Sequence, residues 1–208
     1  MKNNENLNVS GHLEIYKVYD DGNEELVFDE ANTITSGMGV GLGLLYAGSG
    51  ASDITNFQIR YFQLGVSGDS KISDYGVSEV SLVSALGQVA GASDYQDSAD
   101  SNIPLVYHHL MGWNGAQMNN SEGDPSFYFA EIPDNSIKRV DLNSVTYIVY
   151  VDKNSCNSLG APINEVGLFM KNPLGVSPMV SNLVAYRPFN NITKTNDFAL
   201  VFKWTLNF

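Results

Sequence analysis

The stretch from residue 198 to residue 208 alternates between apolar and polar positions with a period of two. One face of it carries five large apolar side chains, those of Leu200, Phe202, Trp204, Leu206 and Phe208. Successive side chains of a β-strand point to opposite faces, so the pattern predicts a strand with one face in the protein core. We expect the end of this segment to be held in the core rather than frayed.

Similar signals recur along the chain and are separated by turn residues. They predict a hairpin over residues 12–29 and further strands over 33–35, 57–64, 127–132, 137–142, 145–151, 163–170 and 179–186. Short strands with turns between them are typical of antiparallel all-β folds. The sequence therefore predicts a mainly β fold, an antiparallel β-sandwich or a jelly-roll-like one, with one or two short helices.

Residues 37–46 carry a glycine at every second position from Gly37 to Gly43. A dinucleotide-binding loop is one interpretation, but the third glycine of that motif is missing at the required spacing, and no acidic residue follows in a βαβ frame. We interpret the segment instead as a short helix of small residues that packs closely against a sheet. An irregular glycine loop is predicted to follow at residues 48–51.

The 208 residues predict a flexible arm over residues 1–10 and a single β-rich domain over residues 11–208. Within that domain, residues 66–125 are rich in Ser, Gly and Asp and predict a long acidic loop region. Only 16% of the residues are charged, although 43% are hydrophobic. Such a surface suits a subunit that buries area in an assembly, and it is also compatible with an ordinary polar β-protein surface.

Charge and composition narrow the classes of partner. Residues 1–100 hold four Lys and Arg against fifteen Asp and Glu, a net charge of −11, which disfavours binding to nucleic acid. Because no stretch reaches the ~20 apolar residues of a membrane span, we expect no membrane contact. The single cysteine, Cys156, and the polar start of the chain favour folding in a reducing cytoplasm. We interpret Cys156 as a structural residue rather than a nucleophile.

Metal ligands are poorly arranged in the sequence. The acidic turn at residues 20–24 lacks the spacing of a calcium loop. His108 and His109 are adjacent, so on a strand they point to opposite faces, and the only other histidine is His12. We therefore expect neither a metal nor a cofactor.

Catalytic motifs are equally incomplete. Residues 65–68 read Gly-Val-Ser-Gly, one residue short of a nucleophile elbow. Glu131 and Glu165 lie on predicted strands and could be imagined as the carboxylate pair of a glycoside hydrolase, but a sandwich strand often carries an exposed glutamate. Tyr- and Asn-rich loops around residues 107–120 could form a sugar-binding surface or anchor an interface. We predict no catalytic residue and no enzymatic activity.

Three segments near the end of the chain form a recognisable series. They read Ile-Asn-Glu-Val-Gly-Leu-Phe at residues 163–169, Leu-Val-Ala-Tyr-Arg-Pro-Phe at residues 183–189, and Leu-Val-Phe-Lys-Trp-Thr-Leu at residues 200–206, with Ile-Thr-Lys-Thr at residues 192–195 between the last two. The series resembles a C-terminal pattern of virion structural proteins of tailed bacteriophages. The hairpin at residues 11–32 resembles the openings of such proteins, and the likeness covers about half of the chain.

This resemblance implies a non-enzymatic structural subunit made in the bacterial cytoplasm and located in the virion. Its place would be in the tail, neck or baseplate, or on the capsid as a decoration. Its partners would be other virion proteins and further copies of itself. The alternative is a fibre or adhesion module that binds a receptor or a host surface glycan.

Glu165 is the one charged residue in an otherwise apolar strand of the series. Arg187 and Lys194 are the nearby candidates to pair with it, in an ion pair that fixes geometry more than it adds stability. Gly167, two residues further on, is predicted to let a neighbouring backbone or ring approach closely.

Overall fold

The computed structural model describes residues 9–65, 128–154, 157, 162–175 and 181–208. Several predictions lie outside these residues: the arm before residue 9, the acidic region 66–125, the sequence around Ser67, the histidine pair, the loops at 107–120, and Cys156. The described part of the chain is mainly β and contains one α-helix.

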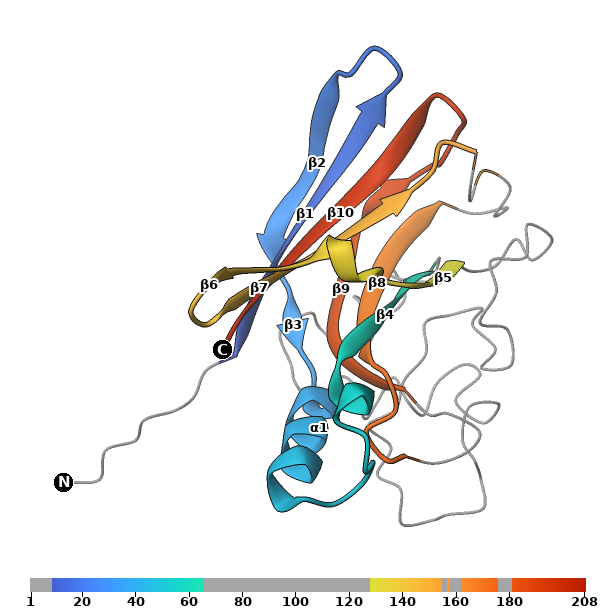
Figure 1. The fold of residues 1–208 in the computed structure, drawn as a ribbon. Helices are drawn as coiled ribbons and strands as arrows, with labels where there is room; N and C mark the ends of the chain where they lie inside the picture. Colours follow the sequence, from blue (N-terminus) through green and yellow to red (C-terminus); the bar gives the residue numbers. More distant parts are fainter. Residues whose placement is uncertain (1–8, 66–127, 155–156, 158–161, 176–180) are drawn as a thin grey trace.

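Ten strands form two antiparallel five-stranded sheets (Figure 1). Sheet A has the order β2-β1-β10-β7-β6, with β1 Ser10–Tyr19, β2 Glu24–Ala31, β6 Ile137–Asp141, β7 Ser144–Val151 and β10 Phe198–Asn207. Sheet B has the order β3-β9-β8-β4-β5, with β3 Thr33–Ile34, β4 Ile59–Gly65, β5 Tyr128–Glu131, β8 Ile163–Met170 and β9 Asn182–Ile192. The predicted antiparallel sandwich is therefore confirmed.

The core lies between the two sheets and contains aromatic rings from both. Phe62 of sheet B and Phe202 of sheet A have ring centroids 5.1 Å apart, and Phe189 lies 6.3 Å from Phe202. The alternation predicted for β10 is confirmed, because its large apolar side chains from Leu200 to Leu206 are buried. Burying each such side chain stabilises the fold by about 1.5–3 kcal/mol.

Phe208 lies beyond the last strand residue. Its backbone is held, since its N–H donates to the carbonyl of Asn143 at 2.9 Å and its carbonyl accepts from the Asn143 amide at 3.1 Å. Its side chain is nonetheless 37% exposed. The expectation that the segment ends in the core is thus correct for the backbone and wrong for the Phe208 ring.

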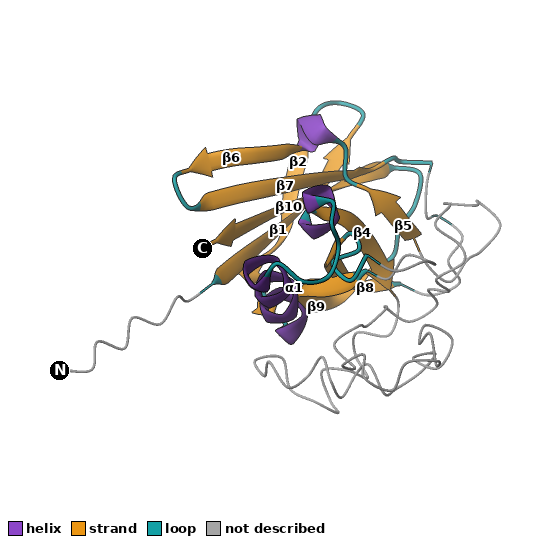
Figure 2. Ribbon diagram, turned by 60° about the horizontal axis from the view of Figure 1, so that its bottom comes forward, coloured by secondary structure: helices purple, strands orange, loops and turns teal. Residues whose placement is uncertain are grey.

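Helix α1, Ser36–Ala47, directly follows β3 and lies at one end of the sandwich, at the bottom of Figure 1. Two single turns of 3-10 helix, η1 at Ile54–Phe57 and η2 at Asp134–Ser136, complete the helical content of the described residues (Figure 2). The helix predicted for residues 37–46 is confirmed, and so is the glycine loop after it. Gly48 and Gly50 adopt positive φ angles of 63° and 87°, which glycine tolerates without strain.

Candidate interaction site at the helical end of the sandwich

Helix α1 contains no charged residue in its twelve positions. It begins after Thr35, which has an extended backbone, and it ends at Gly48, whose left-handed backbone lets its N–H donate to the Leu45 carbonyl at 3.2 Å. A helix on a protein surface ordinarily has a charged or polar face toward water. The outer side of α1 therefore has no charged side chain to face water.

The inner face of α1 packs tightly on sheet B. A Cβ atom on Gly37 would overlap the backbone carbonyl of Leu183, and one on Gly41 would overlap the thioether of Met170. Met38 lies between these glycines in the chain and is buried. The predicted close packing of this helix against a sheet is therefore confirmed, and Gly37 and Gly41 are the residues that permit it.

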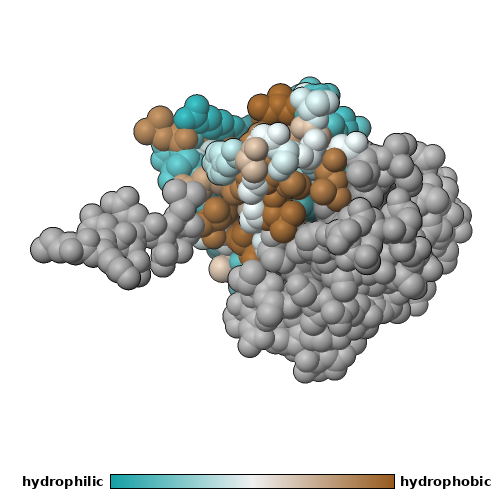
Figure 3. All heavy atoms as spheres, turned by 90° about the horizontal axis from the view of Figure 1, so that it is seen from below, coloured by the Kyte–Doolittle hydropathy of each residue, from teal (hydrophilic) through white to brown (hydrophobic). Residues whose placement is uncertain are grey.

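The outer face of α1 is apolar and open. A Cβ atom on Gly39 or Gly43 would have no neighbour within 4 Å, so these two glycines serve no packing requirement within the described residues. Tyr46 on this helix is 82% exposed, and Ile54 on η1 is 70% exposed. Figure 3 shows apolar atoms gathered at this end of the molecule. We call the surface formed by Gly39, Gly43, Tyr46 and Ile54 the helical face.

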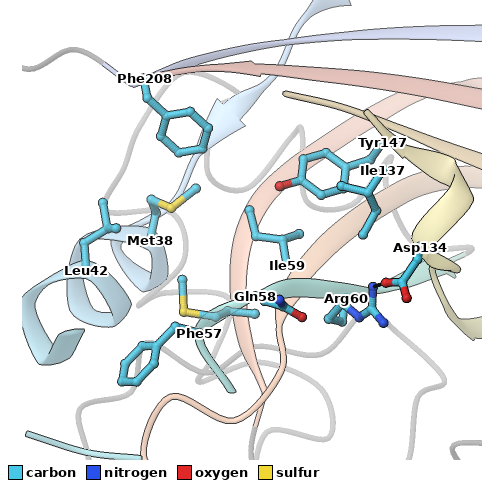
Figure 4. A pocket seen from close by; sticks show the side chains of 11 residues that line it. Met38, Leu42, Phe57, Gln58, Ile59, Arg60, Asp134, Ile137, Tyr147 and Phe208 are labelled. Carbon is cyan, nitrogen blue, oxygen red and sulfur yellow. Dashed lines mark hydrogen bonds and ion pairs between the residues drawn. The ribbon is translucent and has the colours of Figure 1, made fainter. Parts of the chain in front are cut away.

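An open groove of about 260 Å³ lies beside α1 (Figure 4). Its lining is mixed, with polar surface almost as large as apolar surface. Gln58, Arg60 and Asp134 supply polar groups, and the apolar side chains come from both sheets, from α1 and from the end of the chain: Met38, Leu42, Phe57, Ile59, Ile137, Tyr147, Met170 and Phe208. Concave surfaces that combine apolar area with a few polar groups are common sites for docking another molecule. The groove and the helical face both involve α1, since Met38 and Leu42 of this helix line the groove.

The polar rim of the groove is formed by Arg60 and its partners. The Arg60 guanidinium lies 2.5 Å from an Asp134 carboxylate oxygen and 3.7 Å from a Glu131 oxygen. Its side chain is largely buried whereas the two carboxylates are exposed. The positive charge at the rim is thus balanced, and it orders the junction between β4 and η2.

Tyr147 forms a wall of the groove and points its hydroxyl toward it (Figure 4). Burial raises the pKa of this hydroxyl to about 12. The phenol therefore stays neutral at any physiological pH, and the groove wall remains uncharged.

The two candidate catalytic glutamates are not brought together. Strand β4 lies between their strands, with Glu131 opposite Tyr61 and Glu165 opposite Gly65. These β4 positions are four residues apart, or about 13 Å along the strand, which exceeds the spacing of a glycosidase carboxylate pair. Glu165 is fully buried and accepts a hydrogen bond of 2.7 Å from the Tyr186 hydroxyl. Burial, followed by the charge of Glu165, raises the pKa of Tyr186 well above its usual value.

Neither of the two candidates, Arg187 and Lys194, forms the predicted ion pair with Glu165. Arg187 pairs with Glu30 of β2 instead, because Arg187 stands opposite Val166 in the register and therefore points to the other face of sheet B from Glu165. Lys194 donates to three oxygen atoms of neighbouring loops. Gly167 behaves as predicted: a Cβ atom there would lie 2.7 Å from Leu183 and 3.2 Å from the Phe169 ring.

Two of the other candidate ligands, His12 and Asp20, have protein partners. His12 lies 2.5 Å from an Asp29 oxygen, and in the acidic turn Asp20 pairs with Lys153 at 2.7 Å. Within the described ranges, no three His, Cys, Asp or Glu side chains form a group that could hold a metal ion. Neither α1 nor any other described helix has the length and apolar character needed to cross a membrane.

The helical face and the groove were missed by the sequence reasoning. A signal for the helical face was present, since residues 36–47 predict a helix yet contain no charged side chain. The groove had no such signal, because its lining residues come from segments far apart in the chain. Comparison with protein-family models, curated proteins and solved structures gave no match.

Proposed function

We propose that this chain is a non-enzymatic structural subunit of a tailed-bacteriophage particle. It would belong to the tail, neck or baseplate, or would decorate the capsid. It would act through interaction surfaces that pack against further copies of itself and against other virion proteins. The resemblance of residues 163–206 to virion proteins supports the class of particle, and the helical face supports the mode of action.

The observation that carries this proposal is the pair of outward glycines on α1. A glycine inside a helix costs about 0.5–1 kcal/mol relative to alanine. Gly37 and Gly41 offset that cost by close packing on sheet B, but Gly39 and Gly43 face open space. Outward glycines let the backbone of another chain approach the helix closely, as they do where helices pack through small residues.

The exposed apolar side chains around these glycines support the same interpretation. Tyr46 lies on α1 one turn after Gly43 and is 82% exposed, and Ile54 on the following turn η1 is 70% exposed. Aromatic side chains with surrounding apolar area are typical anchors of protein–protein contacts. We assign the helical face to a contact between copies of this chain.

Sedimentation velocity of the purified protein over a range of concentrations tests this proposal. We expect a defined oligomer or polymer, weakened by Tyr46→Ser, with the thermal stability of the subunit unchanged. Tyr46 is a suitable probe because its side chain is 82% exposed and contributes little to the fold. A monomer at every concentration contradicts the proposal, as does turnover of a substrate, while specific binding on a glycan array would favour the adhesion module.

The assignment to a phage particle has a separate test. The genes next to the one that encodes this chain are expected to encode portal, sheath, tube or other tail proteins. A neighbourhood of metabolic enzymes would contradict the particle assignment.

A further inference from the structure

Sheet A has two edge strands, β2 and β6, at its opposite sides. Both are exposed along most of their length. An exposed edge presents unpaired backbone N–H and C=O groups, which can pair with a strand of another chain. The strand order places the two edges on either side of β1, β10 and β7.

The β2 edge is acidic. Its eight residues include Glu24, Glu25, Asp29 and Glu30 and no basic residue. Most of this charge is locally balanced, since Glu25 lies 3.6 Å from Lys17, Asp29 lies beside His12, and Glu30 pairs with Arg187. Glu24, at the start of the strand, is exposed.

The β6 edge is mainly basic. Its five residues include Lys138 and Arg139, both exposed. Asp141 is the one acidic residue, and its carboxylate accepts from the Leu142 N–H at 2.7 Å, within the hairpin to β7. Arg139 donates to the Asp141 and Leu142 carbonyls at 3.1 and 2.8 Å, so its positive charge is held at this edge.

Exposed apolar side chains accompany the charges on both edges. Leu26 stands between the glutamates and Asp29 of β2, and Val140 and Leu142 follow the basic pair of β6. Leu142 is 84% exposed. Each edge therefore offers apolar area beside charges of one predominant sign.

We propose that β2 of one copy pairs with β6 of the next copy and continues sheet A from subunit to subunit. The inference rests on the proposed function and adds a second contact between copies, made by sheet edges rather than by the helical face. Two β2 edges repel each other, and so do two β6 edges, whereas β2 against β6 brings opposite charges together. The contact is thus head-to-tail, and it closes into a ring or runs on as a filament according to the rotation between neighbours.

Irregular register at each edge limits the number of backbone hydrogen bonds that β2 and β6 of neighbouring copies can form. β2 carries a bulge between its pairings with Ile15 and Tyr16, and β6 carries one between Arg139 and Asp141. Bulges interrupt regular pairing, so only short runs of backbone hydrogen bonds form. Attraction between opposite charges then contributes a large share of the binding free energy, which makes the association sensitive to salt.

Two charge reversals test the pairing, Glu24→Lys on β2 and Lys138→Glu on β6. Both side chains are exposed, and circular dichroism is expected to show the wild-type fold. In sedimentation velocity we expect each variant alone to associate at least about tenfold more weakly than wild type. An equimolar mixture is expected to regain association, because each variant brings one unaltered edge. Asp152→Lys, which reverses an exposed charge directly after β7, is the matched control and should behave as wild type.

The outcomes separate this inference from the proposed function. If wild type associates and responds to Tyr46→Ser but not to either reversal, edge pairing is overturned and the structural role stands. If the mixture stays as weak as the separate variants, the head-to-tail arrangement is overturned. Wild-type protein that remains monomeric at every concentration overturns the proposed function together with the inference. A loss of association between ~0.05 and ~0.5 M salt supports edge pairing, and insensitivity to salt contradicts it.

Discussion

The indole nitrogen of Trp204 donates a hydrogen bond of 2.7 Å to the side-chain oxygen of Asn32, 172 positions away in the sequence. Trp204 is buried in β10, the central strand of sheet A, while Asn32 lies between β2 and β3, where the chain leaves sheet A for sheet B. The backbone N–H of Asn32 also donates to the Gly11 carbonyl at 3.0 Å. These contacts fix the crossover between the two sheets.

Asn32→Ala is expected to destabilise the fold by about 1–3 kcal/mol, because the buried indole N–H of Trp204 loses its acceptor. Gly11→Ala should have a similar effect, since a Cβ atom on Gly11 would overlap the Asn32 side chain. Denaturant unfolding of both single variants and the double variant measures the coupling. Gly11→Ala should cost clearly less in the Asn32→Ala background, and strictly additive effects would argue against a shared contact.

The alkaline side of the stability profile depends on Tyr147. Burial raises its folded-state pKa to about 12 from 10.0, so above pH 10 the phenol ionises in the unfolded chain before it does in the folded one. Its raised pKa therefore stabilises the fold fully below pH 10, and this contribution is lost as pH rises toward about 12. In Tyr147→Phe, the free energy of unfolding should fall less steeply over this range. Identical slopes for the two proteins would refute the assignment.

Lys194 ties two loops of the sandwich together. Its buried ammonium donates to the Lys153 carbonyl at 2.9 Å, to the Asn157 side-chain oxygen at 3.0 Å and to the Thr195 carbonyl at 2.7 Å. Lys194→Met keeps much of the side-chain volume but removes all three donors, so we expect a loss of about 2–4 kcal/mol. Thermal unfolding measures it, with Lys171→Met as the control on a less buried lysine. A loss below about 0.5 kcal/mol would mean that the three bonds do not stabilise the fold.

Strands that are marked by a local pattern of apolar residues and turns could be predicted from the sequence alone. Residues 163–170 form β8 with the predicted bounds, because a mostly apolar run between turn residues suits a strand buried on both faces. The strand predicted at 179–186 begins and ends later, as β9, because its pairing with β8 continues through Pro188 to Ile192. Tertiary pairing decided that boundary.

Side-chain partners could not be predicted in the same way. Arg187 is close to Glu165 in the sheet, yet alternation turns the two side chains to opposite faces. Sequence also could not separate the inward glycines of α1 from the outward ones. Residues two positions apart lie about 200° apart around a helix, so one pair had to face sheet B and the other pair away from it. Only the packing of Gly37 and Gly41 on sheet B shows which pair is which.

The outward glycines allow a test in which stability and assembly change in opposite directions. Alanine at Gly39 and Gly43 meets no neighbour within 4 Å, so the double variant should stabilise the subunit by about 0.5–1 kcal/mol for each site through helix propensity. Gly37→Ala, its control on the inner face, should destabilise the subunit, because the new Cβ overlaps the Leu183 carbonyl.

Assembly of the Gly39→Ala, Gly43→Ala variant is the measurement that most directly tests whether the helical face joins copies of this chain. In parallel thermal unfolding and sedimentation velocity, we predict a higher melting temperature together with self-association at least about tenfold weaker than wild type. A variant that is more stable and associates as strongly as wild type would contradict the account.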